Sequence, residues 1–179
     1  MADAAMLAQG AVALVFPVVL VAAAVSDMAR YIIPNALPIG LAVAFLPTAA
    51  LAGLDPAAIG YHALAGLAVL AAGFGLFVLN AMGGGDVKLL AAAAIWTGFE
   101  TLLPFALLVA IFGGLVAAAL LVARRLGRRG ADSVRPWLAR LLSPRQGVPY
   151  GVAIALAGLI IFPRLTVARP LAVLFGLGN

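Results

Sequence analysis

Two aspartates stand out among the six acidic residues of this 179-residue sequence, because each one borders a long apolar run. Asp27 closes one run, and Asp86, 59 positions later, opens another. Two carboxyl groups held close together cannot both ionise cheaply, so one keeps a proton while the other does not. The ionised group can take a proton from an attacking water, and the protonated group can donate to an amide carbonyl. This is the chemistry of an aspartic peptidase.

The composition excludes several other kinds of site. The sequence has no cysteine and one histidine, His62, which rules out a thiolate zinc site, a cysteine nucleophile and a histidine-based metal cluster. We therefore expect no metal and no cofactor. A net charge of +5 could suggest nucleic acid, but most arginines lie in one short stretch between apolar segments. Membrane orientation explains them better, so we expect no nucleic-acid partner.

Three consecutive glycines, Gly83, Gly84 and Gly85, come directly before Asp86. Glycine has no side chain to obstruct an extended substrate strand, and it tolerates unusual backbone angles. We interpret these three residues as a wall of the site.

The elements that must position the two acids are apolar helices. Hydrophobic residues make up 66% of the chain and charged residues 9%, and the mean hydropathy is +1.21. A helix that spans a bilayer needs about 20 apolar residues. The sequence predicts an all-α integral membrane protein, a bundle of about six transmembrane helices in a single membrane-embedded domain, residues 1–179. The expected segments cover about 7–25, 36–54, 59–79 and 86–98, then a fifth that follows a break at Pro104 and runs to about 123, and a sixth at about 148–162.

The distribution of basic residues predicts the orientation of this bundle. With the amino terminus outside, nine basic residues fall on one side and two on the other, so the first side is expected to be the cytoplasm. The nine are Arg30, Lys88, Arg124, Arg125, Arg128, Arg129, Arg135, Arg140 and Arg145. Both Asp27 and Asp86 then lie at the cytoplasmic face. A basic cytoplasmic loop at about 124–147 could form an amphipathic helix on anionic lipid.

Two motifs carry a resemblance to a known family. Residues 82–90 read Met-Gly-Gly-Gly-Asp-Val-Lys-Leu-Leu, which resembles the GxGD motif of the prepilin peptidase family, the type IV leader peptidases. Residues 26–35 read Ser-Asp-Met-Ala-Arg-Tyr-Ile-Ile-Pro-Asn, which resembles the family's first motif, an Asp followed by Arg and then Ile-Pro-Asn. A third stretch, Val-Pro-Tyr-Gly-Val-Ala-Ile-Ala at 148–155, is similar to the start of the family's last span.

The resemblance implies a GxGD aspartic membrane protease in which Asp27 and Asp86 are the catalytic pair. It would cleave leader peptides from prepilins and pseudopilins at the cytoplasmic surface of the bacterial inner membrane, as a multi-pass protein without a cofactor. The pilus assembly machinery is a further expected partner. The amino-terminal domain with paired cysteines of the long members is absent from this sequence, so methyltransferase activity is not expected. The short form resembles the peptidases of Flp-type, tight-adherence pili.

Four further residues near the motifs are candidates for binding the substrate or shaping the site. They are Arg30, Pro34, Asn35 and Lys88. Each also has a simpler structural interpretation: the two basic residues as anchors at the lipid headgroups, Pro34 as a loop former and Asn35 as a turn or cap residue. Trp96 is expected among the aromatic residues at the outer membrane interface.

Several alternatives remain open at this point. Asp86 is a good helix N-cap, and Asp27 is spaced to pair with Arg30 on a helix surface. A different enzyme would be a membrane peptidase with a serine and lysine pair, Ser26 and Lys88, if the lysine lost its proton. A non-enzymatic alternative is a small transporter or channel in which the two acids bind a cation or relay protons.

Overall fold

The structure is a computed structural model that describes residues 2–126, 143 and 147–168. Within these residues every regular element is helical. In chain order they are α1 (Ala2–Ala13), α2 (Val15–Arg30), α3 (Ala36–Leu51), α4 (Pro56–Val78), α5 (Gly84–Leu126) and α7 (Tyr150–Ile161), followed by the short 3-10 turns η3 (Phe162–Arg164) and η4 (Thr166–Ala168). The all-α prediction is confirmed for the described residues.

Three helical stretches are long and apolar enough to cross a membrane: Ala8–Arg30, which joins α1 to α2, then α4, and α5. Two more apolar helices, Ala36–Leu51 and Tyr150–Arg164, are shorter. Large apolar side chains such as Val18, Leu67 and Leu107 point away from the bundle and are 55–63% exposed. A surface of this kind is stable when lipid covers it. The helices are therefore those of a membrane protein, and the number and orientation of the spans remain predictions.

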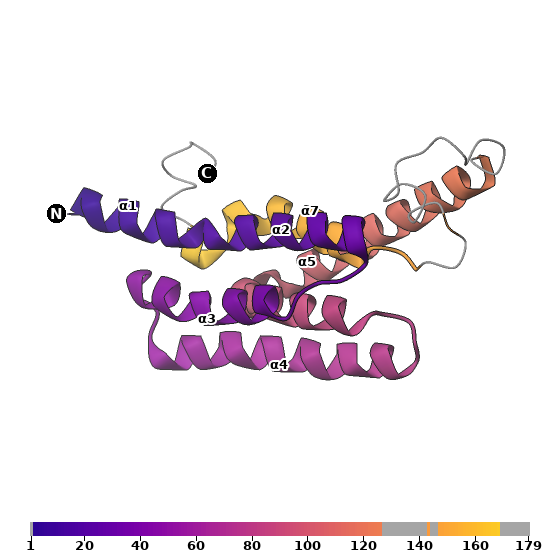
Figure 1. The fold of residues 1–179 in the computed structure, drawn as a ribbon. Helices are drawn as coiled ribbons and strands as arrows, with labels where there is room; N and C mark the ends of the chain where they lie inside the picture. Colours follow the sequence, from indigo (N-terminus) through magenta and orange to yellow (C-terminus); the bar gives the residue numbers. More distant parts are fainter. Residues whose placement is uncertain (1, 127–142, 144–146, 169–179) are drawn as a thin grey trace.

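The long helix α5 reverses direction at Gly98. A straight helix would separate Asp86 from Arg124 by about 57 Å. Instead, Arg124 donates a 3.0 Å hydrogen bond to the carbonyl of Gly147, and the Asp86 carboxylate interacts with the nearby amide of Gly151. Both ends of α5 thus lie beside the start of α7. Figure 1 shows the two arms, the first running beside α4 and the second rising beside α7.

The sequence predicts that the fourth segment ends at about residue 98, and the structure reverses there, at Gly98. The further break predicted at Pro104 is wrong, because Pro104 lies inside the helix. Gly98 has φ 55° and ψ −177°, a conformation that is essentially restricted to glycine. Pro104 instead lies near the start of the second arm, where its ring interrupts few helical hydrogen bonds. The two arms correspond to the fourth and fifth segments predicted from the sequence.

His62 of α4 stabilises this reversal. The break deprives carbonyls of the preceding turn of their helical donors. The His62 ring lies against Gly98, and its Nδ1 pairs with the carbonyl of Ile95 at 2.6 Å. The ring also packs on Phe45, with 4.9 Å between ring centroids. The histidine thus joins α4, α3 and α5 at the end of the bundle opposite the two acids.

Trp96 lies in the core, so its predicted place at the membrane interface is wrong. The side chain is fully buried and contacts the rings of Phe16 and Phe45. Its indole N–H donates a 2.8 Å hydrogen bond to the carbonyl of Leu41. Because this carbonyl satisfies the only polar atom of the side chain, the indole does not need the aqueous interface.

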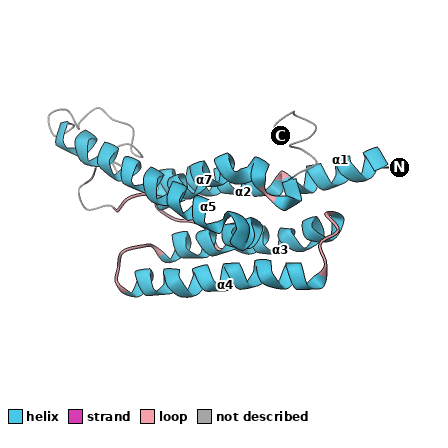
Figure 2. Cartoon of the chain, turned by 180° about the vertical axis from the view of Figure 1, so that it is seen from behind, coloured by secondary structure: helices cyan, strands magenta, loops and turns pink. Residues whose placement is uncertain are grey.

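Small residues let the helices approach closely. Gly73 of α4 faces the Val87 side chain of α5, and Gly158 of α7 faces Leu20 and Phe16 of α2. Such contacts between small and large residues are typical of helix pairs in membranes. In Figures 1 and 2, α3 and α4 lie on one side of the bundle and α2 and α7 on the other, and α5 packs against α3, α4 and α7. The helix predicted within the basic loop lies outside the described residues.

Candidate active site

Asp27 lies on the buried face of α2, three residues before the helix ends. It follows Phe16, Leu20 and Ala23 at helical spacing, and all four side chains are buried. Asp27 is only 5% exposed. It is therefore not a surface acid paired with Arg30, which is exposed. Burying a carboxylate costs free energy unless the acid has a partner, so a buried acid at the end of an apolar stripe often has a function.

Asp86 is the third residue of α5 and not its N-cap. The helix begins at Gly84, after the carbonyl of Gly83 has accepted its first hydrogen bond, from Val87. The Asp86 side chain folds back so that Oδ2 lies over Gly83, whose amide interacts with the carboxylate. An acid in this position satisfies a free amide at the start of the helix. The other oxygen, Oδ1, is buried, and no hydrogen-bond partner for it is found in the described part of the chain.

Gly151, in the first turn of α7, joins the two acids. Its amide donates a 2.8 Å hydrogen bond to Asp27 Oδ2. The Asp86 carboxyl interacts with the same amide and, electrostatically, with Asp27. Three helices, α2, α5 and α7, therefore end or begin around one pair of carboxyl groups. The structure brings together the two residues that the sequence singled out.

The three glycines before Asp86 act through close approach rather than through unusual backbone angles. Positive φ values among the described glycines occur at Gly53 and Gly98, so this part of the expectation is wrong for Gly83, Gly84 and Gly85. A Cβ atom on Gly83 would lie 2.8 Å from Asp86 Oδ2, and one on Gly85 would lie 3.2 Å from Ile33 Cβ. Gly84 instead lies near the Phe77 ring. Two of the three thus make room for the acid and for the loop after α2.

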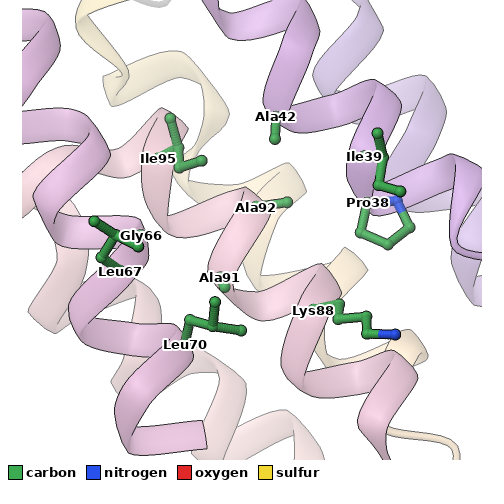
Figure 3. A pocket seen from close by; sticks show the side chains of 10 residues that line it. All are labelled: Pro38, Ile39, Ala42, Gly66, Leu67, Leu70, Lys88, Ala91, Ala92 and Ile95. Atoms are coloured by element: carbon green, nitrogen blue, oxygen red, sulfur yellow. The ribbon is translucent and has the colours of Figure 1, made fainter. Parts of the chain in front are cut away.

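Lys88 and Asn35 interact directly with each other. The Lys88 ammonium donates a 3.0 Å hydrogen bond to Asn35 Oδ1, which ties α5 to the start of α3. Lys88 also lies at one end of an apolar cavity of about 210 Å³ between α3, α4 and α5. Figure 3 shows this cavity, with Leu67 and Leu70 of α4 opposite Pro38 and Ile39 of α3. Lys88 therefore lies between the end of α5 that carries Asp86 and an apolar cavity.

The remaining candidate residues are exposed or bonded elsewhere. Arg30 and Pro34 are exposed. The Ser26 hydroxyl donates a 2.7 Å hydrogen bond to the carbonyl of Ile32, so it orders the loop between α2 and α3. Among the described residues, no three His, Cys, Asp or Glu side chains lie close enough together to hold a metal ion.

The sequence reasoning missed Tyr31 and Arg124, and it assigned no role to Gly151. Tyr31 directly follows α2, and its amide bonds the carbonyl of Asp27 at 2.7 Å. Burial raises the pKa of the Tyr31 phenol, while Arg124 lowers it and Asp27 raises it further. Tyr31 thus lies within the electrostatic reach of both residues. The phenol remains protonated at neutral pH.

Comparison with known proteins identifies the family to which these residues belong. The sequence model of the type IV leader peptidase family matches residues 14–118, which include Asp27 and Asp86. The chain belongs to the type IV leader peptidase family. A 60-residue stretch, 32% of the chain, is 47% identical to the prepilin leader peptidase/N-methyltransferase of Escherichia coli. No solved structure matches the chain.

The chain spans about a quarter of the length of that relative, since the matched stretch covers 25% of it. The matched range contains Asp27, which lies on α2, and Asp86, which lies on α5. The family match ends at residue 118. The match therefore does not include Arg124 and Gly151. Their interactions with Tyr31 and Asp27 are seen in the structure of this chain.

Proposed function

We propose that the protein is an aspartic endopeptidase that removes leader peptides from prepilins and pseudopilins, with Asp27 and Asp86 as its catalytic pair. The observation that carries this proposal is the convergence of both carboxyl groups on the amide of Gly151. Two buried acids around one donor cannot both be stable as anions, so the pair holds one proton.

The arrangement supports catalysis by an activated water. Asp27 already accepts a hydrogen bond from Gly151, which stabilises its anionic form. Asp27 would take a proton from the water as the water oxygen attacks the amide carbon. Asp86, whose Oδ1 has no partner, would carry the shared proton and donate it to the carbonyl oxygen. The proton taken from water would then pass from Asp27 to the leaving nitrogen as the C–N bond breaks, and a hydroxyl of the tetrahedral intermediate would return its proton to Asp86, which restores the pair.

The basic residues support a cytoplasmic location for this chemistry. Arg30 ends α2, Lys88 lies in the second turn of α5 and Arg124 lies in its last turn. All three lie at the end of the bundle that contains the two acids. By the positive-inside rule this end faces the cytoplasm of a multi-pass inner-membrane protein, next to anionic lipid. A prepilin reaches such a site if its leader is cytoplasmic and its apolar segment is in the bilayer. We assign Flp-type, tight-adherence pilins as the substrates and the pilus assembly machinery as a partner on the resemblance alone.

The transporter alternative fits this arrangement less well. Transporters bind ions near the middle of the membrane. Asp27 lies three residues from the end of α2, and Asp86 is the third residue of α5. Both acids are thus at one end of the bundle, where a hydrolase has access to water and to a peptide.

The test is cleavage of a purified prepilin by the purified protein in detergent. We expect Asp27→Asn and Asp86→Asn each to reduce kcat at least about 1,000-fold. Asp55→Asn is the matched control. Asp55 caps α4 through a 2.8 Å bond to the amide of Ala58, and asparagine caps a helix equally well. Full cleavage by both active-site variants would refute the proposal.

A further inference from the structure

Tyr31 adopts a backbone conformation that is rare for a residue with a large side chain. Its φ is 55° and its ψ is 31°, in the left-handed region. Residues other than glycine rarely occupy this region outside functional sites and turns. The conformation ends α2 directly after Arg30, and the Ser26 hydroxyl, bonded to the Ile32 carbonyl, fixes the next residue of the loop. The Tyr31 amide bonds the Asp27 carbonyl, and the Tyr31 phenol lies within electrostatic range of the Asp27 carboxyl.

The Tyr31 hydroxyl is buried, and no acceptor for its proton is found among the described residues. The Arg124 guanidinium lies beside it and acts on the phenol oxygen through its charge and as a hydrogen-bond donor. A guanidinium carries only donors, so it can approach the phenol oxygen but cannot accept the phenol proton. The proton of Tyr31 is therefore available to an acceptor that is not part of the protein. Buried polar atoms without partners are rare and often belong to functional sites.

The reaction proposed above would supply such an acceptor. As water attacks a peptide carbonyl, negative charge develops on the carbonyl oxygen. Donors that are fixed in advance around this oxygen stabilise the transition state. One of the two acids supplies one donor. A second donor must also lie close to Asp27, remain protonated at neutral pH and have no competing acceptor among the residues that the structure describes. Tyr31 meets these requirements.

We propose that Tyr31 is a third catalytic residue, whose hydroxyl donates a hydrogen bond to the carbonyl oxygen of the scissile peptide as that carbon becomes tetrahedral. This inference rests on the proposed aspartic peptidase function. Arg124 is a positioning residue in this arrangement. It bonds the Gly147 carbonyl and approaches the phenol oxygen, so it orients the phenol proton away from itself.

The test compares Tyr31→Phe with the wild type in the prepilin cleavage assay. Phenylalanine keeps the ring and removes only the hydroxyl, so we expect the fold and the thermal melting temperature in detergent to be unchanged. Loss of one donor to the developing oxyanion should lower kcat about 100-fold. The KM should stay within about threefold, because the bond strengthens in the transition state and not in the bound substrate. Tyr61→Phe, on the exposed face of α4, is the matched control.

A double-mutant cycle tests the role of Arg124. If Arg124 acts through the Tyr31 hydroxyl, Arg124→Ala should lower kcat markedly in the wild type and much less in the Tyr31→Phe background. An equal decrease of kcat in both backgrounds would show that Arg124 does not act through the Tyr31 hydroxyl.

The outcomes separate this inference from the proposed function. If Tyr31→Phe cleaves with a kcat within threefold of wild type while Asp27→Asn is inactive, the catalytic role of Tyr31 is wrong and the aspartic mechanism stands. If the rate of Tyr31→Phe falls only together with its melting temperature, the hydroxyl is structural and the inference is again wrong. If both aspartate variants cleave normally, the proposed function fails, and this inference fails with it.

Discussion

The backbone amide of Gly151 bonds the carboxylate of Asp27 at 2.8 Å, and residue 151 has no room for a side chain. A Cβ atom there would lie 2.8 Å from Asp27 Oδ2, 3.0 Å from Asp27 Cβ and 3.1 Å from Ile33 Cδ1. Of these neighbours, Asp27 Cβ is attached directly to the backbone and cannot easily move. Glycine therefore allows α7 to approach α2 until its main chain becomes the partner of the acid.

Gly151→Ala should displace the Asp27 carboxylate. The substitution retains the backbone amide, but the new methyl group forces α2 and α7 apart at the site. A displacement of a catalytic group by about 1 Å can lower the rate about 100-fold. We expect kcat for prepilin cleavage to fall by at least about 100-fold.

Gly158→Ala is the matched control for this prediction. Residue 158 lies two turns further along α7 and faces Leu20 and Phe16 of the same partner helix. The substitution loosens the same helix pair without touching an acid, so it should lower the melting temperature more than the activity. Equal losses of activity in the two variants would show that Gly151 contributes only to packing.

Gly98→Ala should destabilise the reversal of α5. The backbone angles at Gly98 are essentially closed to alanine, at a cost of about 1–3 kcal/mol, and the methyl group would lie 2.8 Å from His62 Cε1. We expect a lower melting temperature in detergent. Gly114→Ala, on the second arm of the same helix with no atom within 4 Å of the new Cβ, should show no loss. An unchanged melting temperature for Gly98→Ala would contradict the reversal.

Ser26→Ala distinguishes the aspartic mechanism from a serine and lysine pair. In the structure Ser26 bonds Ile32 and Lys88 bonds Asn35, so each side chain is engaged elsewhere. Loss of one such hydroxyl bond costs about 0.5–1.5 kcal/mol, and kcat should fall by no more than about tenfold. Thr101→Val, which removes a 2.7 Å bond to the Thr97 carbonyl, controls for stability. Complete loss of cleavage in Ser26→Ala alone would favour a serine nucleophile.

The two acids could be predicted from the sequence because several local signals agree on them. Asp27 continues the spacing of Phe16, Leu20 and Ala23 on one helix face. Asp86 follows three glycines and precedes an apolar run. Such patterns are contained within a few turns of chain. The apolar segments could be predicted for the same reason, since hydropathy is a local property.

The errors concern features that depend on distant parts of the chain. Proline is a visible helix breaker, yet α5 continues through Pro104, and its reversal lies at Gly98, where the sequence predicts the end of the fourth segment. Trp96 has a carbonyl partner 55 positions away in α3. Its predicted position near the end of an apolar segment gives no sign of this partner. The role of Tyr31 depends on an arginine near the far end of α5. These relationships are tertiary, and no short window of sequence contains them.

The hydrogen bond between Gly151 and Asp27 joins residues 124 positions apart, and this separation determines when the candidate site can assemble. During synthesis, α2 and both arms of α5 enter the bilayer before α7 has left the ribosome. Until then Asp27 lacks its amide donor, and the acids have no third helix to hold them. A nascent chain that ends before residue 150 therefore contains both aspartates but not a finished site. The candidate site can therefore assemble only after α7 has been synthesised.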